Sequence, residues 1–365
     1  MLPLKAFIYK YRRWEFWHSY IVYSIPSIYF VFLSIRARSW GFFSSANPNI
    51  ANGGFGMESK YDIYQTIPKE YSPITIFFAA NTTLAQVMTQ VSNAAISFPF
   101  IIKPDIGFQG KRVEKINNEK ELGKYLANVH FNFIVQELIQ YPHEMGVFYC
   151  RYPHQQEGFI TGLVYKEYPS VLGDGIHTIA ELIKQDMRLY IQSYLFNIET
   201  ATYKNDVLPV GEKFYLSKIG NHARGTKFLD ISHLITPALS KQMDTICKNI
   251  PLFYFGRLDI KYNSLEELAA GKKFSIIELN GAASLPTYMY DPQHSLLYAW
   301  KEMIKHFKIL YKISIENRKS GHHFLSFNQV INFVKEHIDY MKVIKNTNNR
   351  SVSYTHLTLP TKRIV

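Results

Sequence analysis

The segment from Phe98 to Val113 constrains the fold of this chain more than any other. It runs from a short apolar stretch bounded by prolines into a turn that contains Gly107 and Gly110. A short, bounded apolar run predicts a buried β-strand. Because glycine lets the backbone bend tightly and approach a ligand closely, a strand that delivers Lys103 into such a turn predicts a phosphate cradle. An ordinary solvated turn would have the same composition, so this segment alone leaves both interpretations open.

A second pair of strands is predicted at residues 255–261 and 274–281. The segment between them is polar, which favours a hairpin. Pairing the two strands would bring Asp259 near Glu278 and Asn280, and the last two share a face because they are two residues apart. Two carboxylates and an amide oxygen are hard oxygen ligands, which suit Mg²⁺. The pattern therefore predicts a metal site, with a solvated hairpin face as the alternative.

Four motifs follow one another along the chain: the Lys103 strand with its glycine-rich turn, residues 134–139 with Glu144, then residues 257–259, then residues 278–280. In this order they resemble the ATP-grasp superfamily over residues 98–310, most of all the D-alanine–D-alanine ligase and the glutathione or cyanophycin synthetase branches. The resemblance implies an α+β fold in which two α+β subdomains clasp ATP. It further implies Mg²⁺, with Mn²⁺ as an alternative, and an ATP-dependent ligase that joins a small-molecule carboxylate to an amine through an acyl-phosphate, converting ATP to ADP and phosphate.

The resemblance also implies roles for single residues. Lys103 would contact the nucleotide phosphates, the loop from Gly107 to Gly110 would close over them, and Glu144 would bind the ribose. The nucleotide-binding set is Lys103, Gly107, Gly110, Gln136, Glu137, Ile139, Glu144 and Lys261, of which residues 136–139 would read adenine. The catalytic set is Arg257, Lys103 and Arg224, and the metal ligands are Asp259, Glu278 and Asn280. Cations on the non-bridging oxygens and rigid positioning are what phosphoryl transfer requires.

Three further segments match less closely. Arg224 lies in a loop at residues 221–226, which resembles a substrate-facing or phosphate-facing loop, with a solvated basic loop as the alternative. Residues 171–183 contain an Asp-Gly turn and a capping box. The favoured interpretation of this segment is a structural connection near the substrate. Residues 281–286 depart from the pattern of many relatives, which leaves the acceptor-side pocket and the second substrate open.

Composition agrees with an enzyme of this size. The chain has 365 residues and 47% hydrophobic content, enough for one large core or two smaller ones. Its net charge of +12 favours anionic partners, and no nucleic-acid-binding motif is present, so nucleic acid is excluded as a partner. Cys150 and Cys247 stand among apolar residues and are expected to be buried free thiols in a reducing cytosol. The expected location is cytoplasmic, with the inner membrane surface as a further possibility.

The N-terminal segment is apolar and aromatic. Residues 19–35 carry no charge, and basic residues flank both ends. This stretch is slightly shorter than the roughly 20 residues that span a bilayer. Three interpretations stay open: a helix in the membrane surface, a helix packed on the catalytic domain or on a second copy in a homodimer, and a true span. Peripheral membrane contact would then be made through residues 1–40.

The expected organisation has five parts. They are residues 1–45, the apolar aromatic N-terminal helix; 46–97, a loop and small α/β segment; 98–310, the catalytic domain; 311–350, C-terminal helices; and 351–365, which resemble the translation of a sequencing-library adapter and are treated as an artefact. The glycine- and asparagine-rich loop at 42–60 is interpreted as a linker, with acceptor specificity as the alternative. Two other functions remain: a phosphotransferase on the same scaffold, and a membrane-associated nucleotide-binding protein without turnover.

Overall fold

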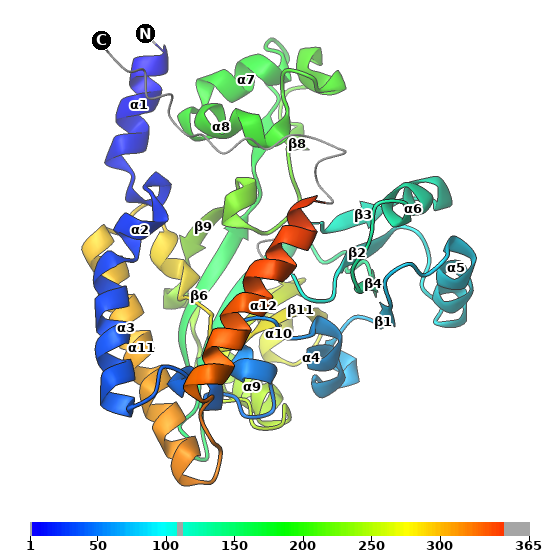
Figure 1. Ribbon diagram of the computed structural model, residues 1–365. Helices are drawn as coiled ribbons and strands as arrows, with labels where there is room; N and C mark the ends of the chain where they lie inside the picture. The colour runs from blue at the N-terminus through cyan, green and yellow to red at the C-terminus, as the bar shows by residue number, and fades with distance from the viewer. Residues whose placement is uncertain (1, 108–111, 347–365) are drawn as a thin grey trace, which may run out of the picture.

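The protein has an α+β fold built on three antiparallel sheets, as a computed structural model shows (Figure 1). The structure describes residues 2–107 and 112–346. A four-stranded sheet and a five-stranded sheet form the two main units, and a two-stranded sheet with its helices projects at one end of the molecule. N-terminal and C-terminal helices run along the outside.

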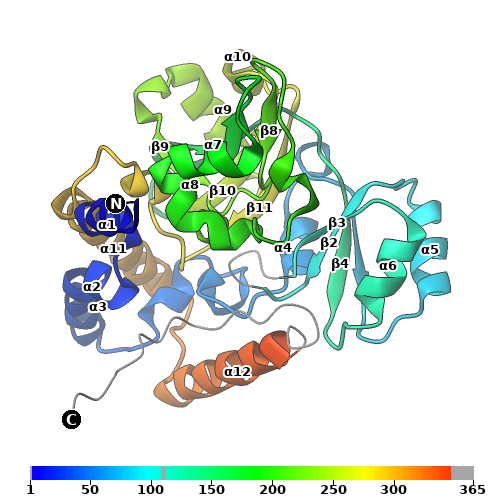
Figure 2. The same cartoon turned by 90° about the horizontal axis from the view of Figure 1, so that it is seen from above.

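The four-stranded sheet has the order β1-β4-β2-β3. Its strands are β1 (Thr75–Phe78), β2 (Phe100–Pro104), β3 (Glu114–Ile116) and β4 (Phe133–Glu137), and helices α5 (Leu84–Asn93) and α6 (Glu119–Leu126) cover it (Figure 2). Val87, Val91 and Leu122 from the helices pack on Ile102 and Phe133 from the sheet. The predicted strand of Lys103 is therefore confirmed as β2.

The five-stranded sheet has the order β11-β10-β5-β6-β9. Its strands are β5 (His143–Cys150), β6 (Phe159–Glu167), β9 (Lys227–Asp230), β10 (Phe255–Tyr262) and β11 (Phe274–Asn280), with helices α9 (Pro237–Lys248) and α10 (Leu265–Ala269). Strands β10 and β11 pair antiparallel, which confirms the predicted pairing, although α10 lies in the connection between them.

Strand alternation separates core from site in this sheet. On β10, Leu258 and Ile260 point into a core formed with α9, whereas Arg257 and Asp259 point to the opposite face. The register with β11 shifts between Asp259, which pairs with Glu278, and Ile260, which pairs with Ile276. The extra residue of this bulge, Ile277, resets the alternation of β11. As a result Ile276 and Leu279 both enter the core, while Glu278 and Asn280 face the site.

The two-stranded sheet is an insertion between β6 and β9. It consists of β7 (Ser170–Leu172) and β8 (Lys213–Tyr215), with helices α7 (Ile179–Gln185) and α8 (Met187–Gln192). Thr178 caps α7, and its capping box with Glu181 is present as expected. These elements form the top of the molecule in Figure 1.

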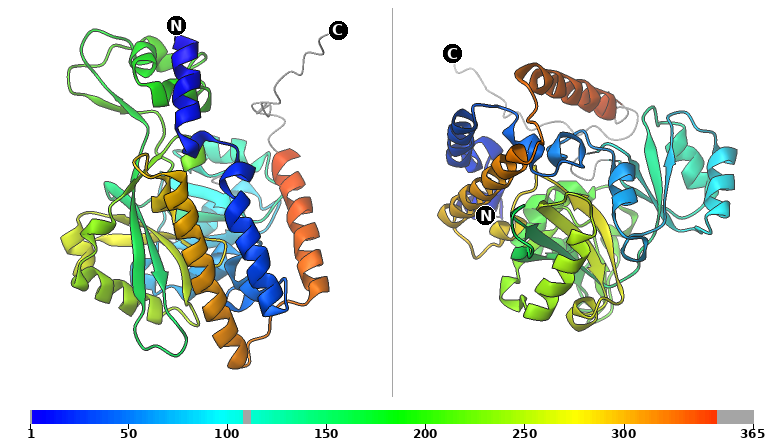
Figure 3. Two further views of the ribbon diagram at one scale, coloured as in Figure 1. Left: turned by 90° about the vertical axis from the view of Figure 1, so that its left-hand side faces the viewer. Right: turned by 90° about the horizontal axis from the view of Figure 1, so that it is seen from below.

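The terminal helices pack on the sheets and on one another. They are α1 (Leu2–Arg12), α2 (Ser19–Val22), α3 (Ser24–Ala37), α4 (Lys60–Thr66), α11 (Leu296–Lys319) and α12 (Phe327–Asn346). Helix α3 lies beside α11 (Figure 3), where Leu33 and Ala37 contact the cluster of Leu310 and Ile313. Within the described ranges, no helix is long and apolar enough to cross a bilayer.

The loop at residues 42–60 is a packed segment, so its interpretation as a linker is wrong. The buried amide of Asn47 donates to Gly53 O and Phe255 O at 2.9 and 2.8 Å, and accepts from the backbone N–H groups of Tyr254 and Phe255. At Gly54, which has φ +77°, a Cβ atom would lie 2.6 Å from the Cα atom of Gly281. The loop is therefore held directly against the residues that follow β11.

Candidate active site

One large cavity, of about 1220 Å³, is lined by side chains from both main sheets. The four-stranded sheet contributes Lys103, Gln136 and Glu137, and the five-stranded sheet contributes Glu144, Lys166, Arg257, Asp259, Lys261, Glu278 and Asn280. Residues from the loop at 54–60 and from the N-terminal segment complete its wall. The cavity exceeds the volume of most single-ligand sites, so it has room for two reactants.

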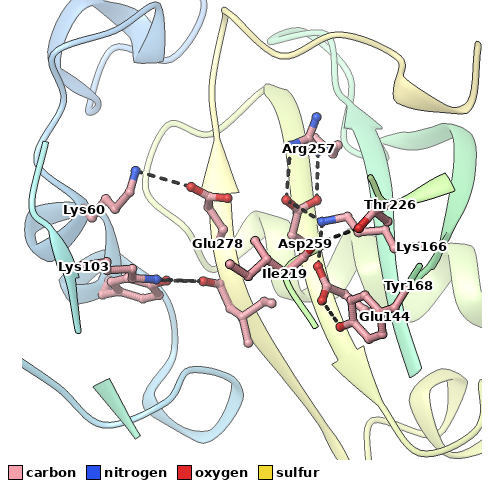
Figure 4. A network of polar contacts seen from close by, with 12 residues as sticks. Lys60, Lys103, Glu144, Lys166, Tyr168, Ile219, Thr226, Arg257, Asp259 and Glu278 are labelled. Carbon is pink, nitrogen blue, oxygen red and sulfur yellow. Dashed lines mark hydrogen bonds and ion pairs between the residues drawn. The ribbon is translucent and has the colours of Figure 1, made fainter. Parts of the chain in front are cut away.

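A buried cluster of charges occupies the five-stranded side of this cavity (Figure 4). Asp259 Oδ1 accepts a hydrogen bond from Arg257 Nε at 2.8 Å, and its Oδ2 accepts one from Arg257 Nη2 at 3.1 Å. Lys166 Nζ lies 3.0 Å from the same Oδ2. Lys166 also donates to Glu144 Oε1 at 2.8 Å. The side chains of Lys166, Glu144 and Asp259 are all almost completely buried. Such charges are tolerated in the interior only because each has a partner of opposite sign.

Glu278 stands on the other side of the cluster. Its Oε1 lies 3.3 Å from Lys60 Nζ, at the start of α4. Although burial by itself would raise the pKa of Glu278, the positive charges of Lys60, Lys103 and Arg257 lower it, so the carboxylate is ionised at neutral pH. The same carboxylate and Glu58 raise the pKa of Lys60 against the opposing effect of its own burial. The site therefore holds charged groups of both signs whose ion pairs a charged ligand can replace.

The predicted metal ligands fit a magnesium ion by their chemistry. Asp259 and Glu278 are directly opposite each other in the β10–β11 ladder, and Asn280 is opposite Arg257. The amide Nδ2 of Asn280 is buried and has no hydrogen-bond partner among the described residues. No contact of this nitrogen therefore fixes the orientation of the amide. Among the described residues, no group of three or more His, Cys, Asp or Glu side chains that could hold a metal is found. Any metal would have to share the carboxylates with Arg257, Lys166 and Lys60.

Lys103 is buried between the two sheets. Its ammonium donates to Tyr64 Oη and Gln136 Oε1, both at 2.9 Å, and to the carbonyl of Ile277 at 3.3 Å. Ile277 is the bulged residue of β11, and its carbonyl also accepts a hydrogen bond from Tyr64. The bulge thus both turns Glu278 into the cavity and provides an anchor for Lys103. A phosphate that binds Lys103 would replace one of these acceptors.

The state of Lys103 gives a pH-dependent prediction. Burial lowers the pKa of its ammonium to about 8, so the charge is present at pH 7 and is lost as the pH rises through 8. We expect the affinity for an ATP analogue to fall between pH 7.5 and 9.5, approaching about tenfold per pH unit above the pKa. Titration of a fluorescent ATP analogue would measure this. Lys103→Arg, which keeps its charge, should show a flatter profile, and a flat profile in the unsubstituted protein would contradict the assignment.

The other predicted residues are placed as follows. Glu137, Ile139, Gly107 and Lys261 line the cavity with Gln136. Both oxygens of Glu144 already accept hydrogen bonds, from Lys166 and Tyr168, so a ribose would have to displace one of them. Of the loop that contains Arg224, residues 221–223 line the cavity, and the charge of Arg224 acts on Glu114. Gly110 lies outside the described residues.

Sequence reasoning missed three residues of the site. Lys166 and Tyr168 lie on and just after β6, a strand with no recognisable motif, and Lys60 follows a loop interpreted as a linker. The signal for Lys60 was a charged pair, Glu58 and Lys60, next to glycines that allow close backbone approach. Lys166 carries no such signal, because its partners are distant in sequence.

Comparison with known proteins gives matches at the level of structure only. No family model and no curated protein matches the chain. Among solved structures, the VanG D-Ala:D-Ser ligase from Enterococcus faecalis matches with 14% identity and a TM-score of 0.40, over 69% of this chain and 61% of that one. A bifunctional glutathione synthetase from Pasteurella multocida matches with 14% identity and a TM-score of 0.38, over 70% and 38%. The ATP-grasp ligase PsnB, complexed with minimal precursor, matches with 12% identity and a TM-score of 0.35, over 68% and 60%.

The chain thus spans less than two thirds of the length of each of these three proteins. At such identities and TM-scores the assignment of each residue rests on its own contacts, described above.

Proposed function

We propose that this protein is an ATP-dependent carboxylate–amine ligase. One observation carries the proposal: two different sheets place a buried lysine and a carboxylate–arginine cluster in the same cavity, which is large enough for a nucleotide and a second molecule. Lys103 comes from the four-stranded sheet, and Arg257, Asp259 and Glu278 come from the five-stranded sheet. A cleft between two such units is suited to holding ATP while excluding water from the reacting groups.

In this proposal the nucleotide lies between the sheets. Lys103 contacts the phosphates, residues 136–139 at the end of β4 line the adenine pocket, and Arg257 meets the transferring phosphoryl group. Arg257 is held rigid by its two hydrogen bonds to Asp259, so little conformational entropy is lost when it binds an anion. Rigidly placed cations are what a phosphoryl group requires as negative charge redistributes over its oxygens.

The proposed chemistry has two steps. A carboxylate oxygen of the first substrate attacks the γ-phosphorus of ATP; the new O–P bond forms as the bond to the β,γ-bridging oxygen breaks, and ADP leaves. The amine of the second substrate then attacks the acyl carbon, the C–N bond forms, inorganic phosphate leaves, and the amine loses a proton to solvent. No side-chain nucleophile takes part, which agrees with the absence of a Ser–His–Asp pattern in the sequence.

Asp259, Glu278 and Asn280 would hold Mg²⁺, or Mn²⁺ as an alternative, and the ion would neutralise charge on the phosphates. What the chain itself provides is a set of cations that stabilise these ligands before any ion binds. Lys60 forms an ion pair with Glu278, and Lys166 forms one with Asp259, so both carboxylates are held in the cavity wall.

Phosphate release from ATP tests the proposal. The full chain, with Mg²⁺, would be given a panel of carboxylic acids, each with and without a panel of amines. We expect phosphate release to require a carboxylic acid and to increase when the matching amine is added. Phosphoryl transfer to an alcohol without phosphate release would favour the phosphotransferase, and nucleotide binding without any turnover would favour the non-catalytic alternative.

The outer face of α3 supports a second proposal, peripheral contact with an anionic membrane. Ile25, Ile28, Phe32 and Ile35 form an exposed stripe on the side of α3 opposite the buried residues Leu33 and Ala37. Arg36 and Arg38 stand at its end, and further basic residues lie in and after α1. An apolar stripe with basic flanks is suited to the interface of anionic lipids.

Flotation with phosphatidylserine-containing vesicles tests this contact. We expect the full chain to float at low salt and less at high salt, and the Ile28→Glu variant to lose binding. Val210→Glu, which changes an equally exposed apolar residue in the insertion, should have no effect. Equal behaviour of the two variants would contradict membrane contact through α3. Point substitutions are preferable to truncation, because removing α3 would expose the apolar face of α11.

A further inference from the structure

The cavity does not end at the metal ligands. It continues to a second end, whose wall includes Trp17, Val22 and Tyr23 from the N-terminal segment, together with Phe228, Leu285 and Tyr290. We call these six residues the apolar end of the cavity. None of them was assigned a role from the sequence, and Leu285 lies in the segment at residues 281–286 that departs from the pattern of many relatives.

The N-terminal segment is fixed in place at this end. Trp14 stacks on Tyr290 with ring centroids 5.4 Å apart, and its Nε1 donates to His294 O at 2.8 Å. Arg13 donates to Pro292 O at 2.9 Å, and the hydroxyl groups of Tyr23 and Tyr290 are hydrogen-bonded to each other. These contacts hold the N-terminal segment against residues 290–294, so the segment forms a defined part of the cavity wall.

A short stretch of chain joins the apolar end to the reacting centre. Residues 281–290 run directly from Asn280, the last predicted metal ligand, to Tyr290, and Ser284 Oγ donates back to Asn280 O at 2.7 Å. Along this stretch Thr287 lines the cavity, is 8% exposed, and has a hydroxyl without a hydrogen-bond partner. An unsatisfied buried hydroxyl costs free energy, so a polar group of a bound molecule would find a partner here.

Charges near the apolar end are already neutralised. Glu15 also lines the cavity, but its Oε1 lies 2.8 Å from Arg188 Nη1 and its Oε2 lies 3.4 Å from His222 Nε2. Burial by itself would raise the pKa of Glu15, but the interactions with His222 and Arg188 outweigh this effect and lower the pKa. The carboxylate therefore stays ionised within its ion pairs. The apolar end therefore offers aromatic and aliphatic surface and one free hydroxyl to a substrate.

We propose that the apolar end binds the hydrophobic tail of the carboxylic acid substrate, and that Thr287 donates a hydrogen bond to a polar group of that substrate. The inference rests on the proposed function in one respect: acyl-phosphate chemistry requires the carboxylate to lie beside the γ-phosphate, near Arg257. The cavity that Arg257 lines is also lined by Leu285, Tyr290 and Tyr23. The substrate class is thus an acid with an alkyl or arylalkyl tail, not a small polar amino acid.

Equilibrium binding of simple carboxylates tests the assignment. The full chain, saturated with Mg²⁺ and a non-hydrolysable ATP analogue, would be titrated with acetate, octanoate below its micellar concentration, and 3-phenylpropanoate. We expect octanoate and 3-phenylpropanoate to bind at least about tenfold more tightly than acetate, since each buried methylene is worth about 0.8 kcal/mol. Equal affinities for all three acids would overturn the proposal.

A matched pair of tyrosines locates the binding. Tyr23→Ser should remove the advantage of octanoate over acetate, whereas Tyr20→Ser, three residues earlier and 68% exposed, should leave it unchanged. Because the carboxylate is the only polar group of these three acids, Thr287→Val should weaken the binding of all three, and Thr287→Ser should restore it. Equal effects of the Tyr20 and Tyr23 variants would place the tail elsewhere and overturn the proposal. Tail-dependent binding without phosphate release would refute the ligase while leaving the apolar end assigned, so the two failures are distinguishable.

Discussion

Replacing Glu278 with glutamine is expected to lower ATP turnover at least about 100-fold while leaving the fold intact. The carboxylate is partly exposed in the cavity, and its main contact is Lys60 at 3.3 Å. Its replacement therefore removes a negative charge from the reacting centre but few contacts that stabilise the core. Loss of a single electrostatic contribution to a transition state typically costs about 10²–10³-fold in rate. Phosphate release measured beside a thermal unfolding curve would show both effects.

Two further variants sharpen this experiment. Glu266→Gln changes an exposed carboxylate on α10 and should retain full turnover. Asp259→Asn should lose turnover and also stability, because Arg257 would lose its ion-pair partner and Lys166 would lose one of its two. Turnover near the unsubstituted level in both Glu278→Gln and Asp259→Asn would refute the assignment of the metal ligands.

Lys166→Met is expected to destabilise the protein by about 3–5 kcal/mol, the usual cost of removing one partner of a buried ion pair. Lys166 is the only link that the structure describes between the carboxylates of Glu144 and Asp259, and methionine has a similar length but no charge. Asp259 would then keep its hydrogen bonds from Arg257, and Glu144 would keep the one from Tyr168. Urea unfolding, followed by tryptophan fluorescence, would measure the loss.

The double variant Lys166→Met/Glu144→Gln separates charge from packing. If electrostatics causes the loss, neutralising Glu144 should recover part of the free energy of unfolding. The exposed Lys301→Met on α11 should change stability by less than about 0.5 kcal/mol. A loss in the Lys166 variant no larger than in the Lys301 variant would show that the cluster does not support the fold.

The sequence predicted those parts of the fold that short-range patterns determine. The strands of Lys103, Asp259 and Glu278 follow from apolar runs and their boundaries, and the capping box of Thr178 follows from the position of Glu181 three residues later. The opposition of Asp259 and Glu278 follows from pairing two neighbouring strands. Each of these inferences needs residues that are close in sequence or joined by a short connection.

The rest of the site depends on contacts that no local pattern encodes. The bulge at Ile277 is a product of sheet packing, yet it provides the carbonyl that binds Lys103. Lys166 on β6 reaches Asp259 on β10 across one intervening strand, β5, and Asn47 reaches β10 across 208 positions of sequence. The loop at residues 42–60 was interpreted as a linker because its glycines and asparagines resemble a flexible chain, whereas the structure uses them for close packing against Gly281.

Trapping with hydroxylamine tests the central claim most directly. The full chain would be incubated with ATP, Mg²⁺, hydroxylamine and each carboxylic acid of the panel, and hydroxamate and phosphate would be measured together. If an acyl-phosphate forms, hydroxylamine attacks its acyl carbon and releases phosphate, so the account predicts hydroxamate and phosphate in equal amounts, absent without ATP and absent in Glu278→Gln. Carboxylate-stimulated ATP turnover that yields no hydroxamate with any acid would contradict the account.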